Sequence, residues 1–265
     1  MSTVLVTGAS GFVGGALVRA LQAVGDDVVC LVRPASDRRG LAGVRFAVGD
    51  MADPDALRAA LRGVDVVYHA AAVLKAPWRP DFESGNVEGA ACVAQACEAQ
   101  GDSPPVLVLV SSLAAAGPAP AARSGPPPRA RLESDPPAPV SRYGRAKLAC
   151  EHAVARVAGG VPVSIVRPPT VLGDGDTSAL PLFRWAARGI RLRPGPPDLP
   201  LSVIDVADLA RLLRLVAVGG ERLRLPKTNE DPSASGPDPG ATGQGIYFAA
   251  DPQATSWAGL ADAVA

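Results

Sequence analysis

The stretch TVLVTGASGFVGGALVRALQAVG, residues 3–25, decides how the rest of the sequence is interpreted. A short β-branched run at 3–7 comes first, and from Phe12 the apolar residues follow a helical period. Between them lie three glycines spaced three residues apart, Gly8, Gly11 and Gly14. Glycine lets a backbone approach a ligand closely, and the free N–H groups at a helix start favour a pyrophosphate. The stretch therefore predicts a strand, a dinucleotide-binding turn and a helix.

The same alternation of strand and helix continues through the first two-thirds of the chain. Further strand-like apolar runs lie at 27–33, 44–50, 64–70, 106–112 and 161–168. Helical segments are expected at 54–61, 82–100 and 141–157. Apolar strands separated by helices are typical of a parallel sheet with both faces covered. The predicted fold class is therefore α/β, a doubly wound parallel sheet (Rossmann fold) over residues 1–168.

Residues 169–265 are less regular. We expect them to form mainly a small C-terminal substrate lobe, apparently shortened, together with elements that return to the core. Helices are expected at 177–189, 205–218 and 256–265, and a strand at 245–250. Asp205 and Asp208 are both candidate N-caps of the second of these helices. Two Pro- and Gly-rich stretches, 117–139 and 226–244, are predicted loops, and the first is either a lid over a site or a solvated insertion.

Composition excludes several classes of function. Lysine plus arginine and aspartate plus glutamate number 26 each, so the net charge is zero and argues against a nucleic-acid or anionic-membrane partner. The 4 cysteines form no C-x-x-C pair and are interpreted as reduced core residues of a cytoplasmic protein. With only 2 histidines, we expect no metal site.

The segment SRYGRAK, residues 141–147, places Tyr143 and Lys147 on one helix face, one turn apart. A free phenol has a pKa near ~10, which is too high for a base at neutral pH. A neighbouring ammonium favours the phenolate and lowers that pKa. The pair is therefore a candidate acid/base group, and the alternative is a Tyr–Lys pair on a solvated helix surface.

Several motifs occur together in an order that resembles the extended short-chain dehydrogenase/reductases, the NAD-dependent epimerase/dehydratase family. They are TGASGFVG at 7–14, GDMADPDAL at 49–57, HAAA at 69–72, NVEGA at 86–90, VSS at 110–112, YGRAK at 143–147 and RPPTVLGDGD at 167–176. The last of these, with LVRP at 31–34, is closer to the hydroxysteroid dehydrogenase and dihydroflavonol reductase branch than to the nucleotide-sugar branch.

The resemblance implies a Ser-Tyr-Lys site. Tyr143 would be the general acid/base, Lys147 would hold the cofactor ribose, and Ser112 would bind the substrate oxygen, with Ser111 as the alternative serine. The implied cofactor-binding residues are Gly8, Ser10, Gly11, Phe12, Val13, Gly14, Arg33, Asp50, Met51, Ala70, Ala71, Ala72, Tyr143, Lys147, Pro168 and Val171.

Some of these residues have other interpretations. Asp50 would accept a hydrogen bond from adenine, or instead cap the helix that follows. His69 is expected to pack at a strand end, and Asn86 is similar to a structural asparagine of the family. An apolar substrate pocket would draw on Val73, Leu74, Trp78, Leu172, Phe183 and Trp185.

Arg33 ends the second strand, about where an NAD-preferring site carries a carboxylate for the ribose hydroxyls. A guanidinium there suits the 2′-phosphate of NADP, so NADP(H) is predicted to be preferred over NAD(H). The alternative is an ordinary solvated arginine. Arg38 and Arg39 add positive charge nearby, and Asp37 is the nearest acid.

These residues predict an NAD(P)-dependent oxidoreductase that acts on a carbonyl or secondary alcohol of a small apolar substrate. A nucleotide-sugar epimerase or dehydratase is one alternative, for which Arg188, Arg191 and Arg193 could hold a diphosphate. A non-catalytic NADP-binding protein is another. The resemblance also implies a homodimer through a four-helix interface built from 82–100 and 141–157.

Overall fold

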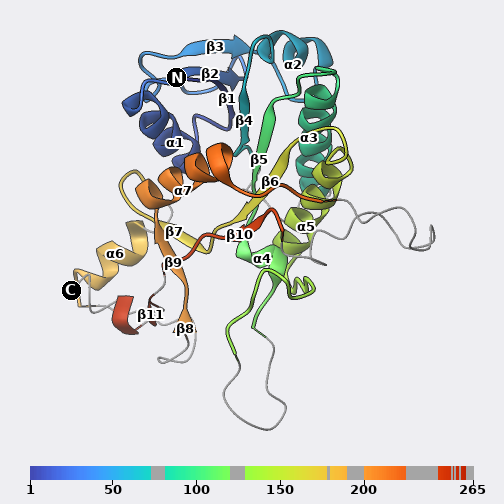
Figure 1. Ribbon diagram of the computed structural model, residues 1–265. Coiled ribbons are helices and arrows are strands. Elements are labelled where there is room, and N and C mark those ends of the chain that lie inside the picture. Colours follow the sequence, from blue (N-terminus) through green and yellow to red (C-terminus); the bar gives the residue numbers. More distant parts are fainter. Residues whose placement is uncertain are drawn as a thin grey trace.

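A central parallel sheet organises the computed structural model, which describes residues 1–72, 81–119, 129–177, 180–189, 200–224, 244–251, 253, 255–256 and 258–260 (Figure 1). Its seven strands run in the order β10-β6-β5-β4-β1-β2-β3, and all neighbouring pairs are parallel. The strands are β1 (Thr3–Thr7), β2 (Asp27–Val32), β3 (Arg45–Val48), β4 (Val66–His69), β5 (Val106–Val110), β6 (Val163–Arg167) and β10 (Ile246–Phe248). This is the doubly wound order with one extra strand beside β6.

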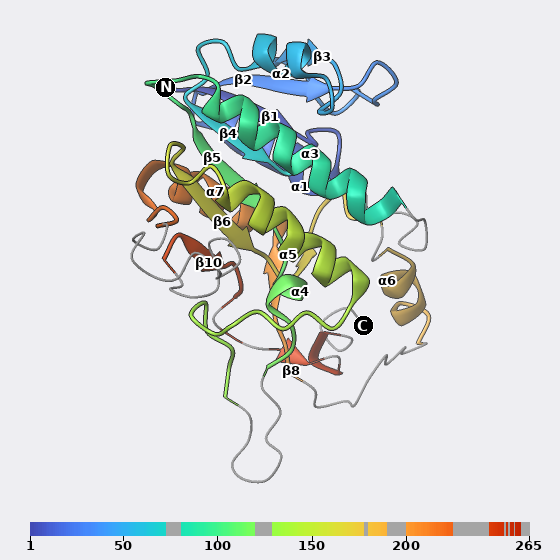
Figure 2. The same ribbon diagram turned by 90° about the vertical axis from the view of Figure 1, so that its right-hand side faces the viewer.

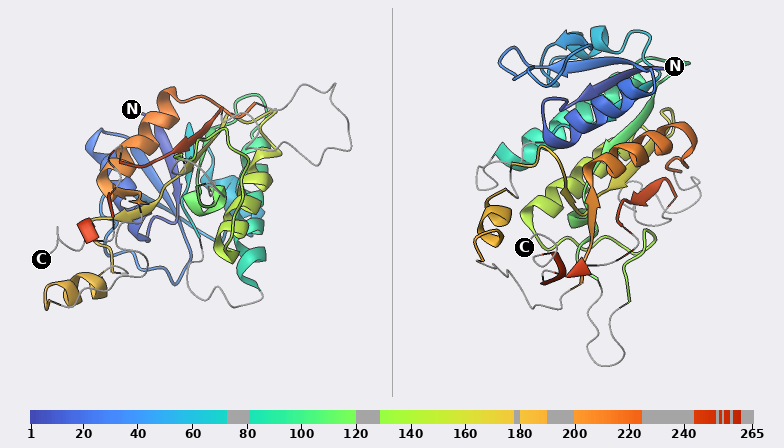
Figure 3. Two further views of the ribbon diagram at one scale, coloured as in Figure 1. Left: turned by 90° about the horizontal axis from the view of Figure 1, so that it is seen from below. Right: turned by 90° about the vertical axis from the view of Figure 1, so that its left-hand side faces the viewer.

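Helices cover both faces of the sheet. One face carries α2 (Pro54–Ala60), α3 (Asp81–Glu98) and α5 (Arg142–Ala155), of which α3 and α5 lie side by side (Figure 2). The other face carries α1 (Phe12–Ala23) and α7 (Val206–Gly219), which also pack against each other (Figure 3). Each face has its own apolar core, because successive strand residues point to opposite sides.

The carboxyl end of the sheet meets the smaller elements. They are the short helix α4 (Leu113–Ala116), the helix α6 (Leu180–Ala186) and the strands β7 (Thr170–Leu172), β8 (Pro200–Leu201), β9 (Val203–Asp205) and β11 (Thr255–Ser256). Strand β7 pairs in parallel with β9, and β8 pairs antiparallel with β11. These elements lie below the sheet in Figure 1, next to the ends of β5 and β6.

The predicted fold class is confirmed, and each of the predicted strand segments contains a strand. Asp205 is the N-cap of α7, since its carboxylate accepts a hydrogen bond from the Ala207 amide at 2.7 Å. Sequence periodicity missed the short elements α4, β7, β8, β9 and β11, because runs of two to four residues carry no period.

The predictions for the C-terminal helix and for the two loops are wrong in part or fall on residues outside the described part of the chain. The expected helix at 256–265 is wrong at its start, where Ser256 pairs in β11; residues 258–260 are helical, and the last five residues lie outside the described part. Of the two predicted loops, residues 120–128 and 226–243 also lie outside it. All four cysteines are free thiols. None of the described helices has the length and apolar character that a membrane crossing requires.

Candidate active site

The glycine turn brings the first helix close to the strand ends. Gly8 adopts φ +74°, and a Cβ atom built there would lie 2.6 Å from the Ala71 amide nitrogen. A Cβ on Gly14 would lie 2.1 Å from the Gly8 carbonyl oxygen, so no larger residue fits at either position. Gly11 begins helix α1 with extended backbone and no side-chain cap. The first N–H groups of α1 are therefore available to an anionic ligand.

Strand β4 ends beside this turn. The Ala70 amide donates to the Thr7 carbonyl at 3.2 Å, which holds the small residues 70–72 next to Gly8. Thr7 Oγ1 lies 2.8 Å from His69 Nδ1, inside the protein. Burial, and then the charge of Lys147, lower the pKa of His69 to about 3. His69 is therefore a neutral packing residue near pH 7, in agreement with the expected role at a strand end.

Ser112 and Tyr143 meet at the end of β5. Ser112 is the N-cap of α4, where its hydroxyl accepts from the Ala114 amide at 3.1 Å, and it lies close enough to Tyr143 to lower the pKa of the phenol. Ser111 is buried and donates its hydroxyl proton to Glu151 instead. The structure thus pairs Ser112, and not Ser111, with the phenol.

Lys147 lies one helical turn beyond Tyr143 and is 6% exposed. Its ammonium donates to the Val110 carbonyl oxygen at 2.7 Å, at the end of β5. Burial lowers the pKa of Lys147, while the charges of Cys150 and Glu151 act in the opposite direction. The ammonium is thus held between helix α5 and the strand that precedes Ser112.

The predicted pKa of Tyr143 is wrong in direction. Burial raises the pKa, and the hydrogen bond from Ser112 lowers it only in part. The net effect is a phenol that keeps its proton near pH 7, because removing the side chain from water disfavours the phenolate. The arrangement is suited to giving a proton more than to taking one.

Helix α5 is held against α4 at a position that sequence analysis did not single out. A Cβ atom on Gly144 would lie 2.2 Å from the Ala114 carbonyl oxygen. The helix begins at Ser141, whose hydroxyl accepts from the Gly144 amide at 2.9 Å. Because Gly144 follows Tyr143 directly, its lack of a side chain permits the contact that brings the phenol to Ser112.

The adenine-side residues lie at the ends of β2 and β3. Arg33 is exposed, and its amide donates to the Ser36 hydroxyl at 3.1 Å. Arg39 is engaged with Asp37 at 2.7 Å, and the guanidinium of Arg38 lies 5.2 Å from the centre of the Phe46 ring. The side-chain hydrogen bond from Arg39 lowers the pKa of Asp37 to about 2, so this acid is ionised near pH 7.

Asp50 is exposed and its carboxylate accepts from the Ala52 amide at 2.9 Å. The alternative that Asp50 caps α2 is wrong, since Asp53 accepts from the amides of Asp55 and Ala56. Met51 is packed against the core, and a Cβ on Gly89 of α3 would meet its Cε atom at 3.1 Å.

The remaining predicted residues follow β6. The Leu113 amide donates to the Pro168 carbonyl at 2.8 Å, which joins the end of β6 to α4. Val171 lies in β7 and packs against the core of the α1 and α7 face. After β7, a Cβ atom built on Gly175 would lie 3.9 Å from the Phe12 ring. The segment after β7 therefore lies beside the start of helix α1.

The expected apolar pocket is only partly visible. Residues 73–80 and the side chain of Phe183 lie outside the described part, as do Arg191 and Arg193. Leu172 is half-buried, Trp185 is 44% exposed, and Arg188 is exposed. Within the described residues, no group of three or more His, Cys, Asp or Glu side chains is placed to hold a metal ion.

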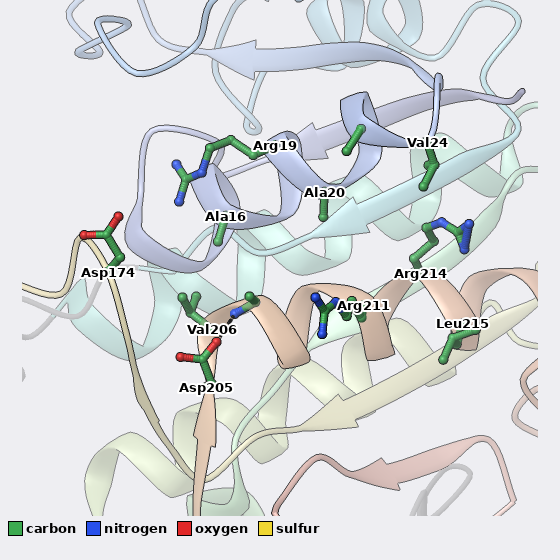
Figure 4. A pocket seen from close by; sticks show the side chains of 12 residues that line it. Ala16, Arg19, Ala20, Val24, Asp174, Asp205, Val206, Arg211, Arg214 and Leu215 are labelled. Atoms are coloured by element: carbon green, nitrogen blue, oxygen red, sulfur yellow. Dashed lines mark hydrogen bonds between the residues drawn. The ribbon is translucent and has the colours of Figure 1, made fainter.

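A separate hollow of about 750 Å³ lies between helices α1 and α7 (Figure 4). Its floor includes the small residues Ala16 and Ala20, and arginines from both helices, Arg19, Arg211 and Arg214, stand around it. It contains none of the residues predicted for the Ser-Tyr-Lys site. The candidate active site is therefore the end of the sheet near β4, β5 and β6, where ligands meet open α/β sheets.

Comparison with known proteins identifies the class of protein. Residues 4–217 match the family described as NAD dependent epimerase/dehydratase, and the chain belongs to this family. Ceramide reductase of Caulobacter vibrioides is 35% identical over 212 residues, covering 79% of this chain and 59% of that protein. A 2-alkyl-3-oxoalkanoate reductase of Stenotrophomonas maltophilia is 32% identical over 225 residues, covering 81% of this chain and 66% of that protein.

Solved structures share the fold. The structure of MoeE5 in complex with UDP-glucuronic acid and NAD superposes with a TM-score of 0.73 at 27% identity, covering 99% of this chain and 81% of that one. The chain spans about half to two-thirds of the length of the curated relatives it matches.

The contact at Gly144 gives a testable prediction. Gly144→Ala places a methyl group against the Ala114 backbone, so we expect it to destabilise the fold by about 1–3 kcal/mol in urea unfolding. Gly160→Ala is the matched control, because a Cβ there meets nothing within 4 Å. Equal stability of the two variants would contradict the tight α4–α5 contact.

Proposed function

We propose that this chain is an NADP(H)-dependent oxidoreductase that reduces the carbonyl group of a small apolar substrate. The observation that carries the proposal is the proximity of Ser112 to Tyr143 at the end of β5, where Ser112 acts on the pKa of the phenol, with the buried Lys147 one turn further along α5. Two hydroxyl groups and an ammonium then converge where a parallel sheet exposes its strand ends.

The cofactor cradle fits the glycine turn. Gly8 and Gly14 leave no room for side chains, and the uncapped N-terminus of α1 offers N–H groups to a pyrophosphate. The small residues Ala70, Ala71 and Ala72 would let the backbone approach the same ligand, with Asp50 and Met51 near adenine and Pro168 and Val171 near nicotinamide. When bound, the reduced nicotinamide supplies the hydride that the protein itself cannot.

Three side chains would each have a separate role in the reaction. Ser112 would donate a hydrogen bond to the substrate oxygen as negative charge develops there. Tyr143 would transfer its proton to that oxygen, so that the carbonyl becomes an alcohol. The raised pKa of Tyr143 favours the protonated phenol, which is the form that can give a proton to the substrate oxygen. Lys147 would bind the ribose and stabilise the phenolate that remains.

The named relatives support a substrate with an alkyl chain. Ceramide reductase and 2-alkyl-3-oxoalkanoate reductase are both named for reducing lipid-like molecules. Exposed Trp185 and half-buried Leu172 lie on the segments that follow β6, where an apolar substrate would enter. We propose a ketone next to an aliphatic chain as the substrate class.

A nucleotide-sugar epimerase or dehydratase is the second candidate, because a solved relative of this fold binds UDP-glucuronic acid and NAD. The two functions differ in cofactor balance. A reductase consumes one reduced cofactor per product, whereas an epimerase returns its cofactor unchanged. Nicotinamide absorbance followed with a ketone and with a UDP-sugar therefore separates them.

A homodimer is proposed through α3 and α5. The described exposed residues of α5 and its C-terminal end include the cations Arg145 and Arg156, and those of α3 include the acids Glu88 and Glu98. Opposite charge on neighbouring helices suits pairing with a second copy. We expect a dimer in sedimentation at micromolar concentration, and a monomer would contradict this interface. A cytoplasmic location stays a prediction.

The role of Tyr143 predicts the effect of removing its hydroxyl. Tyr143→Phe should reduce kcat by about 10²–10⁴-fold, because proton transfer is lost while the ring still fills its place. NADPH affinity, measured by quenching of protein fluorescence, should stay within about twofold. Full turnover in this variant would rule out Tyr143 as the general acid.

The position of Arg33 predicts the cofactor preference. NADPH should bind at least about tenfold more tightly than NADH, since one charge-assisted phosphate contact supplies about 1.4 kcal/mol. Arg33→Asp should erase or reverse the preference and leave NADH affinity nearly unchanged. Arg39→Asp is the control, because Arg39 is already paired with Asp37. Equal affinity of the unmodified protein for both cofactors would contradict the prediction.

A further inference from the structure

We propose that Glu151 and Arg167 are positioning residues for the Ser-Tyr-Lys site, in which Glu151 maintains the charge of Lys147 and fixes the strand that carries Ser112. This role rests on the proposed function. Neither side chain is among the residues proposed above to bind the cofactor or to take part in catalysis.

Tyr143, Lys147 and Glu151 follow one another at four-residue intervals along α5. Residues four apart on a helix lie on one face, so these three form a stripe that leads from the phenol into the core. Lys147 is 6% exposed and Glu151 is fully buried. The carboxylate therefore lies directly behind the ammonium on the same helix.

Arg167, at the end of β6, completes the buried group. Its Nε donates to Glu151 Oε1 at 2.9 Å and its second terminal nitrogen donates to Oε2 at 2.6 Å. Both side chains have zero exposure. Ser111 donates to the same carboxylate, so β5, β6 and α5 are joined at one group. Ser112 follows Ser111 directly, and its position depends on this junction.

A buried ion pair is weak support for stability, since apolar side chains of similar size often stabilise a core as well or better. This pair also leaves one Arg167 nitrogen, Nη1, buried without a hydrogen-bond partner within the described part of the chain. Such a group is costly to bury, and it lies next to Pro168, a candidate cofactor-binding residue. A functional role accounts for it better than packing does.

The charges around Lys147 come from several elements. On α5, the burial-raised pKa of Cys150 leaves a neutral thiol near pH 7, and Tyr143 is a neutral phenol. On β4, His69 is neutral as well. The described acids of the neighbouring helix α3, Glu88 and Glu98, are exposed. On β6, the fully buried cation Arg167 is paired with Glu151. Near pH 7, Glu151 is thus the one buried anion among the described groups that act on Lys147.

Burial lowers the pKa of Lys147, and the interactions with Cys150 and then with the Glu151 carboxylate oppose that change. The carboxylate does so by favouring the ammonium. Without the carboxylate, Lys147 would lose its proton at a lower pH. The phenolate of Tyr143 would then lack a neighbouring cation over the upper part of the working range.

The test is a direct titration of Lys147, which needs neither substrate nor cofactor. The chain has three lysines, Lys75, Lys147 and Lys227, so a protein labelled with ¹³C in lysine gives few side-chain signals. The Lys147 signal is assigned by its loss in Lys147→Met. Its midpoint is then compared between the unmodified protein and the variants below.

Glu151→Gln alone would leave Arg167 buried without a carboxylate, which is strongly destabilising. The main variant is therefore Glu151→Gln/Arg167→Gln, in which two amides replace two charges and the amide at position 151 still offers an oxygen to Ser111. Circular dichroism checks its fold. If this variant does not fold, Glu151→Gln/Arg167→Met takes its place.

We expect the Lys147 midpoint to fall in the double variant, because Glu151 favours the ammonium whereas Arg167, which is neutralised by Glu151, is not among the groups that shift the pKa of Lys147. Glu151→Asp, which keeps the charge, should restore most of the original midpoint. Glu98→Gln, which removes an exposed carboxylate from α3, should leave it unchanged. An unchanged midpoint in a folded double variant would overturn the proposal and leave the pair with a packing role only.

Activity distinguishes this proposal from the proposed function. If the chain is a reductase, the alkaline limb of kcat in the double variant moves to lower pH together with the Lys147 midpoint. A midpoint that falls in a protein with no reductase activity would support the Glu151 effect and contradict the function. If the double variant is an active reductase but its Lys147 midpoint and alkaline limb do not move, the proposed function is supported and the Glu151 effect is contradicted.

Discussion

The ammonium of Lys147 is the group on which the site depends. It lies inside the protein, 2.7 Å from the Val110 carbonyl, and a buried cation is stable only where oxygen atoms and an anion surround it. The strand end supplies the carbonyl, and the anion that we propose is Glu151, one helical turn beyond Lys147. This requirement fixes helix α5 against β5 and so determines where Tyr143 and Ser112 meet.

Close packing at small residues also fixes the relative positions of the elements that form the site. Gly144 lets α5 contact the Ala114 backbone, and Gly8 lets the first turn contact Ala71. Both contacts exclude even a methyl group, and both lie at the carboxyl edge of the sheet. The candidate cofactor cradle and the candidate acid/base pair are thus held by backbone approach, which is more rigid than contact through long side chains.

Much of the fold follows from local sequence. The apolar runs of β1, β2, β5 and β6 are continuous because those strands are buried on both faces, and a parallel sheet is the expected result. The glycine spacing at 8–14 and the four-residue interval between Tyr143 and Lys147 likewise express local geometry. The short strands β7 to β9 and the four-residue helix α4 have too few residues to show a period.

What the sequence could not show depends on distant contacts. Glu151 meets Arg167 across 16 residues and two elements, and no spacing indicates such a pair. The proximity of Lys147 predicts a lowered pKa for Tyr143, yet burial raises it, and burial is a property of the tertiary structure. The helical spacing shows that the Lys147 cation lies near Tyr143, but it does not show that the phenol is removed from water.

The central claim, that this strand end is a reductase site, is tested most directly by following a labelled hydride. NADPH carrying deuterium at C4 of its nicotinamide would be incubated with ketones that bear aliphatic chains, and the products examined by mass spectrometry. A reductase would place deuterium on the new carbinol carbon and form an equal amount of oxidised cofactor. Recovery of the full label in unconsumed NADPH, with a UDP-sugar interconverted instead, would contradict the claim.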